Sequence, residues 1–154
     1  VLRTFSKVYG LAGIRIGYGV ADRELASYLE RARHPFNVNR LAEVAALAAL
    51  DDGDHARRTL ELNAAGIEML TRELGRLGIE TWPSDANFIL ARTGPEVYPK
   101  LLELGVIVRP MKGFGLADCV RISIGRPEEN ERLVKALASL RAADSARGAG
   151  GAEA

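Results

Sequence analysis

A lysine, a glycine-rich turn and an arginine stand close together at the start of the sequence. Ser6 and Lys7 are followed by the stretch GLAG at 10–13 and then by Arg15. This order predicts an amine at a strand end, a turn beside it and a guanidinium on the next strand. Desolvation and nearby positive charge help a lysine to lose its proton, and a neutral amine can form a Schiff base with an aldehyde cofactor. With the hydroxyl groups of Thr4 and Ser6, Arg15 would complete a cradle for an anion.

The ordinary alternative for Lys7 is a solvated surface lysine, because charged side chains usually lie exposed. The combination of groups around it argues against that alternative. In the predicted strand 14–19, Arg15 shares a face with Gly17 and Gly19, since side chains alternate along a strand. A face with one arginine between two glycines leaves room for a bulky anionic group beside the backbone.

Two further arginines, Arg109 and Arg121, stand at the end or in the middle of predicted strands. A guanidinium in such a place can bind a carboxylate or a phosphate through two parallel hydrogen bonds. For Arg109, a surface salt bridge is an equal alternative. Arg121 is flanked by the apolar residues Val120 and Ile122, which favours a functional role. Asn37 could face a ligand cleft, although asparagines in turns more often cap helices.

Other residues whose side chains could act in catalysis or bind a metal give weaker signals of function. His34 and His55 lie at helix boundaries without the spacing of metal ligands, so we expect no metal site. Cys119 is the only cysteine, which excludes an internal disulfide and a Cys-rich metal site and predicts a small core residue. The stretch GFG at 113–115 completes no dinucleotide-binding fingerprint and is expected to form a mobile loop.

Hydrophobic spacing, capping residues and prolines predict the elements that position these groups. Asp22 and Asp54 are expected to cap helices, and Gly78 is expected to follow the end of the third helix. The expected helices are 22–33, 40–50, 54–77, 95–104 and 127–141, and the expected strands are 2–5, 14–19, 79–82, 87–92, 106–109 and 120–124.

The composition is that of an ordinary globular protein. The chain has 154 residues, of which 47% are hydrophobic and 27% are charged. Its formal net charge of +1 removes the overall attraction expected of a protein that binds nucleic acid or an anionic membrane. No segment approaches the ~20 uninterrupted apolar residues of a membrane span. We therefore expect a cytoplasmic protein with no nucleic-acid or membrane partner.

Several short stretches occur in an order and at a spacing that are typical of one enzyme family. They are RTFSK at 3–7, GLAGIRIGY at 10–18, PFNVN at 35–39, ANF at 86–88, GVIVRP at 105–110, VRISIG at 120–125 and PEEN at 127–130. Over residues 1–142 the sequence resembles the fold-type I pyridoxal-phosphate aminotransferases, and more narrowly the histidinol-phosphate aminotransferase branch of class II.

The resemblance implies a role for each candidate residue. Lys7 would carry pyridoxal 5'-phosphate and act as the base that moves the substrate proton. Thr4, Ser6, Lys7 and Arg15 would bind this cofactor. The candidate substrate-binding residues are Arg109, Arg121 and Asn37.

The resemblance also implies an α/β fold, namely the C-terminal part of a fold-type I transferase with a small α+β domain. We expect residues 1–53 to be the C-terminal remnant of the cofactor-binding large domain and 54–78 to be a bridging helix. Residues 79–142 would form the small domain, and 143–154 a disordered tail. Because Val1 already lies in strand-like sequence, we expect the chain to be a fragment of a longer protein, inactive by itself.

The implied reaction is transamination of L-histidinol phosphate with 2-oxoglutarate in histidine biosynthesis, by a homodimer in the full-length protein. Two alternatives stay open. One is an aromatic amino-acid aminotransferase of the same superfamily, with a phosphothreonine decarboxylase as a more remote relative. The other is a catalytically inactive truncated product.

Overall fold

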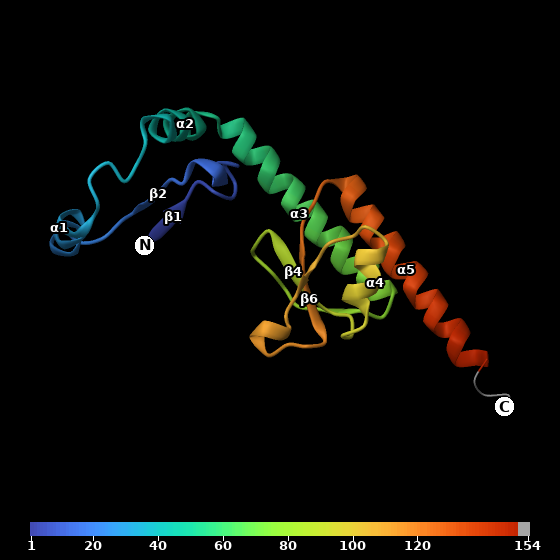
Figure 1. Cartoon of the computed structure of the whole chain (residues 1–154). Coiled ribbons are helices and arrows are strands. Elements are labelled where there is room, and N and C mark those ends of the chain that lie inside the picture. Colours follow the sequence, from blue (N-terminus) through green and yellow to red (C-terminus); the bar gives the residue numbers. More distant parts are fainter. Residues whose placement is uncertain (151–154) are drawn as a thin grey trace. The chain divides into compact units, whose positions relative to one another are not determined.

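The computed structural model describes residues 1–150, with side chains described up to residue 143. The chain forms two compact units, Val1–Glu61 and Leu62–Ala154. Figure 1 shows the elements of each unit, coloured along the sequence. Among the described residues, no helix is both long enough and apolar enough to cross a membrane.

The first unit begins with a two-stranded hairpin. β1 (Leu2–Thr4) pairs antiparallel with β2 (Gly17–Gly19), and a short 3-10 turn, η1 (Ala12–Ile14), lies in the loop between them. The side chain of Phe5 is buried at the start of this loop. Its ring lies 4.9 Å from that of Tyr9 and 6.0 Å from that of Tyr18, measured between ring centres. These aromatic contacts give the loop a hydrophobic base.

Two helices follow, and local signals define both of them. α1 (Arg23–Ala32) begins after Asp22, whose carboxylate accepts the Leu25 N–H at 2.9 Å. This confirms Asp22 as its cap. α2 (Arg40–Asp51) begins after Asn39, whose side-chain oxygen accepts the Ala42 N–H at 2.8 Å. The segment 33–39 between these helices contains Pro35, which cannot continue α1.

The third helix, α3 (Gly53–Arg76), begins in the first unit and ends in the second. Its cap is Asp52, which accepts the His55 N–H at 2.9 Å, so the expectation that Asp54 caps it is wrong. The capping residue therefore lies two positions earlier than expected, and the helix begins at Gly53. Its end is as expected: Gly78 has a φ of +69°, and the next residue, Ile79, donates its N–H to Leu74.

The second unit is built around a four-stranded antiparallel sheet. Its order is β3-β4-β6-β5, and each expected strand is present. The strand expected at 106–109 pairs only at its end, because β5 comprises Arg109 and Pro110 alone. The bounds are β3 (Glu80–Thr81), β4 (Phe88–Arg92), β5 (Arg109–Pro110) and β6 (Cys119–Ser123), with α4 (Val97–Glu103) after β4 and α5 (Pro127–Gly150) after β6.

One face of this sheet forms the hydrophobic core. α3 and α5 lie along the same side of β4 and β6 (Figure 1). The strand side chains that meet the helices are Ile89, Ala91, Val120 and Ile122, and all four are buried. Since strand side chains alternate, their neighbours in sequence, including Phe88 and Arg121, lie on the opposite face. The helical side of the core is supplied by Leu70, Leu74, Leu101, Leu133, Ala136 and Leu137.

α5 is longer than expected. The sequence predicts that it ends at 141 and that 143–154 form a disordered tail, but residues up to Gly150 are helical. Alanine, which is frequent here, has the highest helix propensity and offsets the cost of glycine. Residues 151–154 lie outside the described residues. The expected division into 1–53, 54–78 and 79–142 stays a prediction. The boundary between the two units falls within the sequence of α3.

Candidate active site

Lys7 lies in the loop that joins β1 to β2. The Phe5 N–H donates to the Ile16 carbonyl at 3.2 Å, and the Leu11 N–H donates to the Phe5 carbonyl at 2.9 Å. The loop turns just after the lysine, where Gly10 has a φ of +69° and donates its N–H to the Lys7 carbonyl at 2.9 Å. The Lys7 side chain is exposed. Its amine is therefore accessible on a loop held at both ends by backbone hydrogen bonds.

Two hydroxyl groups precede this amine. The backbone N–H of Ser6 donates to the Thr4 hydroxyl oxygen at 3.0 Å. The Thr4 hydroxyl proton remains available as a donor, because the oxygen acts here only as an acceptor. The structure thus brings Thr4, Ser6 and Lys7 together in one turn, as the sequence predicts.

Arg15 belongs to the same loop but not to the strand. It follows η1 in the left-handed conformation, with a φ of 58°, and its Nη1 donates to the Ala12 carbonyl at 2.7 Å. The expectation that Arg15 shares a strand face with Gly17 and Gly19 is therefore wrong. The 3-10 turn has to end before β2 can begin at Gly17, and Arg15 supplies that end.

Gly17 serves the pairing of the hairpin strands. A Cβ at this position would lie 2.6 Å from the Arg3 carbonyl oxygen on β1. The glycine therefore permits close approach of the two backbones, and this replaces our interpretation that it leaves room for an anion. Sequence alternation alone cannot distinguish these two uses of a glycine.

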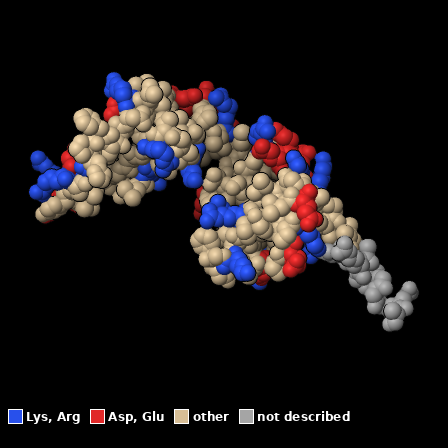
Figure 2. Space-filling model, in the orientation of Figure 1, with Lys and Arg blue, Asp and Glu red and all other residues tan. Residues whose placement is uncertain are grey.

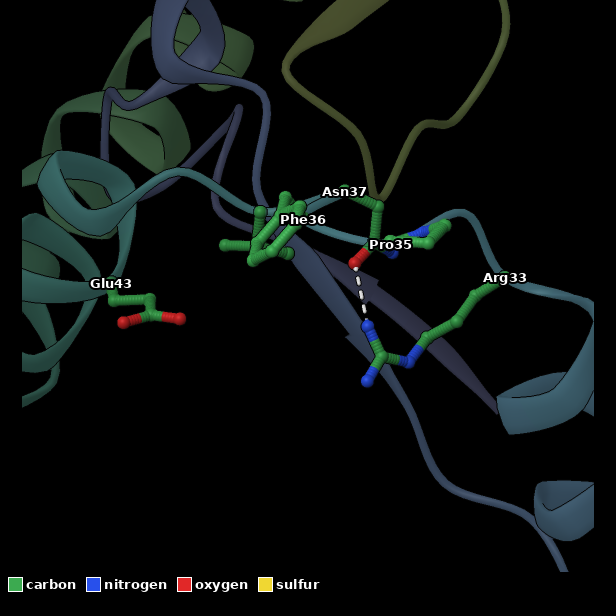
Figure 3. Close-up of a pocket in the computed structure, with 6 residues that line it drawn as sticks. Arg33, Pro35, Phe36, Asn37 and Glu43 are labelled. Carbon is green, nitrogen blue, oxygen red and sulfur yellow. Dashed lines mark hydrogen bonds between the residues drawn. The ribbon is translucent and has the colours of Figure 1, made fainter.

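Asn37 lies in the segment between α1 and α2, beside a surface hollow of about 570 Å³ (Figure 3). Its side-chain oxygen accepts from Nη1 of Arg33 at 3.2 Å. Arg33 also pairs with Glu30, and that hydrogen bond lowers the pKa of the Glu30 carboxyl. Asn37 thus has a structural partner, and its role as a substrate contact stays a prediction. The preceding residue, Phe36, is 96% exposed and has a φ of 56°.

Asn39 is the asparagine that reaches the lysine loop. Besides capping α2, its side-chain nitrogen donates to the Ile14 carbonyl at 3.5 Å. Capping is the usual role of an asparagine in a turn before a helix. The additional contact joins the segment before α2 to the loop that carries Lys7 and Arg15.

In the second unit, the two candidate arginines face each other. Arg109 on β5 is the direct cross-strand partner of Arg121 on β6. Like charges directly opposite each other on a sheet are destabilising. Among the side chains that the structure describes, neither arginine has a carboxylate partner. The Nε of Arg121 is buried without a hydrogen-bond partner. An oxyanion between the two guanidinium groups would relieve both the repulsion and the unpaired donor.

Each of these arginines also contacts a phenylalanine that sequence reasoning did not select. The guanidinium carbon of Arg121 lies 4.9 Å from the centre of the Phe88 ring, and that of Arg109 lies 5.4 Å from the Phe114 ring. The alternation that puts Phe88 on the same face as Arg121 was a usable signal. The loop conformation that brings Phe114 to Arg109 had no such signal.

A third arginine on this sheet, Arg92, has carboxylate partners. Arg92 pairs with Glu80 at 2.9 Å and with Asp118 at 2.8 Å, and these carboxylates raise its pKa. Its guanidinium also lies 5.4 Å from the Trp82 ring. Nearby, Cys119 is buried as expected, and burial raises the pKa of its thiol.

On the face shown in Figure 2, lysine and arginine side chains and aspartate and glutamate side chains are scattered among apolar and neutral residues, and neither sign forms a large patch there. Among the side chains described, which end at residue 143, no group of three or more His, Cys, Asp and Glu is arranged to hold a metal ion. Anion binding therefore depends on individually placed groups, which are the lysine loop in the first unit and the arginine pair in the second.

The sequence of the chain is similar to that of a known enzyme family. Residues 1–137 match the family described as aminotransferase class I and II. The chain is 53% identical over 145 residues to histidinol-phosphate aminotransferase 2 of Ralstonia nicotianae, which covers 90% of the chain and 39% of that relative. The chain thus spans 39% of the length of this curated relative.

Two solved structures share the fold. The histidinol-phosphate aminotransferase from Clostridium acetobutylicum is 30% identical with a TM-score of 0.85, covering 91% of this chain and 45% of that one. The enzyme of the same name from Sinorhizobium meliloti, in complex with pyridoxal-5'-phosphate, is 30% identical with a TM-score of 0.81, covering 92% and 40%.

Proposed function

The chain belongs to the aminotransferase class I and II family, and from this premise we propose that it carries the lysine-bearing part of a histidinol-phosphate aminotransferase. The proposed reaction moves the amino group of L-histidinol phosphate to 2-oxoglutarate. Relatives of that name at about 50% identity support the substrate. The chain spans 39% of the first of these relatives, and the activity is proposed for a protein of the relatives' full length.

The family uses pyridoxal 5'-phosphate, and the groups on the β1–β2 loop fit such a molecule. Lys7 offers an exposed amine to an aldehyde, while Thr4, Ser6 and Arg15 offer two hydroxyls and a guanidinium to a phosphate. When bound, the cofactor withdraws electrons from the substrate carbon, so that a proton on this carbon becomes acidic. In this proposal the Lys7 amine accepts that proton and returns one at the end of the transfer.

The observation that carries the choice of substrate is the facing pair Arg109 and Arg121. Two cations opposite each other, one with a buried unpaired Nε, suit a doubly charged phosphate monoester. The same pair suits the carboxylate of the second substrate. We therefore infer that both substrates present their anionic group to this pair.

Three finer predictions accompany the proposal. Asn37 would contact substrate, the full-length protein would be a homodimer, and it would act in the cytoplasm. We also expect the 154-residue chain by itself to bind pyridoxal phosphate weakly and to show no transaminase activity. Adding the cofactor to the chain and observing a stable bound absorbance with turnover would contradict this last prediction.

The test uses a full-length chimera, in which this chain replaces the matching segment of the 53% identical relative. Glutamate formation from 2-oxoglutarate is measured with L-histidinol phosphate and, in parallel, with phenylalanine as amino donor. We expect turnover with histidinol phosphate to be at least about tenfold more efficient, because only that donor carries a phosphate for the arginine pair. A preference for phenylalanine would instead favour the aromatic amino-acid aminotransferase. A folded chimera that binds the cofactor but transfers nothing would support the inactive alternative.

A further inference from the structure

Phe88 and Arg121 form a contact that crosses from one strand to the next. Phe88 on β4 is paired with Ser123 on β6, so it lies diagonally next to Arg121 on the same face of the sheet. This diagonal distance is within reach of an aromatic ring and a long side chain. Both residues are half-buried, and the guanidinium carbon lies 4.9 Å from the ring centre. Phe114, by contrast, comes from the 3-10 turn η2 (Lys112–Phe114) and is 64% exposed. Phe88 is therefore the less exposed of the two rings that contact these arginines, and it lies on a strand and not in a turn.

A ring beside a guanidinium face leaves the donors of the arginine free. All five N–H bonds of arginine lie in the guanidinium plane, so stacking uses none of them. The in-plane edge remains available for two parallel hydrogen bonds to an oxyanion. In the part of the chain with described side chains, the Nε of Arg121 has no partner.

The nearby pair Trp82 and Arg92 has the same kind of contact, but its arginine also binds two carboxylates. Its ring-to-guanidinium distance is 5.4 Å, but Arg92 is bound by Glu80 and Asp118. The carboxylates fix the position of Arg92, so its ring is not needed for that purpose. Arg121 has no such carboxylate and faces the positive charge of Arg109. Without a support, repulsion would move the two guanidinium groups apart.

On these grounds, and resting on the proposed function, we propose that Phe88 is a positioning residue. Its ring holds the guanidinium of Arg121 beside Arg109, so that both arginines present N–H donors to one oxyanion. Phe88 itself contacts no reacting atom. Its loss is expected to weaken anion binding and to leave the chemistry at Lys7 unaffected.

The experiment measures binding of inorganic phosphate to the full 154-residue chain by the 15N–1H resonances of arginine Nε groups. Sodium chloride at the same ionic strength serves as the reference. We expect phosphate, but not chloride, to shift the Arg121 resonance. Phe88→Leu is expected to raise the dissociation constant for phosphate roughly 3- to 30-fold, the range of a cation–π contact. Phe88→Tyr, which keeps the ring, is expected to stay within about twofold of the original chain.

Trp82→Leu is the matched control, because it removes a ring from an arginine that carboxylates already hold. It is expected to leave phosphate binding unchanged. Phe88→Met, which keeps more of the side-chain volume, replaces Phe88→Leu if the latter does not fold. Unchanged phosphate binding in the folded Phe88 variant, or no phosphate shift at Arg121 in the original chain, would overturn the proposal. Phosphate binding that depends on Phe88 would support it even if the full-length chimera did not transaminate histidinol phosphate, so the two proposals fail separately.

Discussion

At the scale of single residues, arginines on one sheet serve two different purposes. Arg92 lies between two carboxylates, and its charge is used within the protein. Arg109 and Arg121 face each other across β5 and β6 and lack carboxylate partners among the described side chains. The second arrangement costs stability in the absence of an anion, because like charges repel. A binding function explains why such an arrangement is present.

The first prediction concerns Arg121→Leu in the full-length chimera. Loss of charged hydrogen bonds to the substrate anion is expected to raise KM roughly 10- to 100-fold for both histidinol phosphate and 2-oxoglutarate. Arg92→Leu, which removes an arginine occupied by Glu80 and Asp118, is the control and is expected to change neither KM. Steady-state kinetics check this expectation. Unchanged KM values in the Arg121 variant would refute the shared anion site.

A second prediction concerns the pH dependence of Cys119. Burial, and then the hydrogen bond to Asp118, raise the pKa of its thiol above the ordinary value. The folded chain should therefore keep this thiol protonated at a pH where the unfolded chain has begun to form thiolate. Since the unfolded state then binds fewer protons, this group lowers the free energy of unfolding as the pH rises through the ordinary thiol pKa. Alkylation by iodoacetamide, followed by mass spectrometry, should be slow in the native chain at pH 8 and fast in denaturant. Equal rates would contradict a buried thiol.

The site roles of the residues named from the sequence stay predictions, and the partners of these residues could not be deduced from the sequence. Arg109 and Arg121 are separated by a loop, and only the register of β5 against β6 makes them neighbours. Register depends on packing of the whole sheet and not on local sequence. Arg15 was placed in a strand because Ile14 and Ile16 alternate around it. The backbone hydrogen bonds of the Lys7 loop overrode that short pattern.

At the scale of elements, the starts of α1 and α2 were predictable because their signals are local, whereas that of α3 was misplaced. Asp22 immediately precedes α1 and Asn39 immediately precedes α2. The side chain of each accepts a backbone N–H of the first helical turn, as capping residues do. Ends were less predictable. α5 continues to Gly150 through a run of small residues, in which the high helix propensity of alanine offsets the low helix propensity of glycine. The short β5 was placed too early, because the apolar residues at 106–108 resemble strand sequence but do not pair.

The third prediction tests how α3 packs in the second unit. Gly66 on α3 is buried, and a Cβ there would overlap the Ile124 side chain and lie 3.1 Å from the side-chain nitrogen of Asn130. Gly66→Ala is therefore expected to lower the free energy of unfolding by about 1–3 kcal/mol. Gly75→Ala on the same helix meets nothing within 4 Å and is expected to raise it by about 0.5–1 kcal/mol. Urea denaturation followed by circular dichroism measures both changes. A Gly66 variant as stable as the Gly75 variant would show that the contact is absent.

At the scale of the whole molecule, the two units differ in how much they bury. Throughout the wholly described first unit, only Phe5, Ala42 and Ala46 are buried. Large apolar side chains such as Leu25 and Leu29 are about half exposed there. The second unit has a continuous core on one face of its sheet. Sequence periodicity predicted apolar helix faces in both units, but it did not show which faces find partners within this chain.

The fourth prediction follows from this difference in burial. In the 154-residue chain by itself, amides of β1 and β2 are expected to exchange with deuterium at least about tenfold faster than those of β4 and β6. In the full-length chimera, the β1 and β2 amides are expected to gain protection, because more apolar surface is covered there. Hydrogen exchange measured by mass spectrometry provides the comparison. Equal protection of all four strands in the chain by itself would contradict the assignment of stability to the second unit.

We propose Lys7 as the residue to which the cofactor is attached. The direct measurement is borohydride reduction of the full-length chimera loaded with pyridoxal phosphate, followed by peptide mass mapping. We expect a phosphopyridoxyl group on the peptide that contains Lys7, and its loss from that peptide in Lys7→Arg. A phosphopyridoxyl group found instead on Lys100, Lys112, Lys135 or a lysine of the relative's own segment would contradict it.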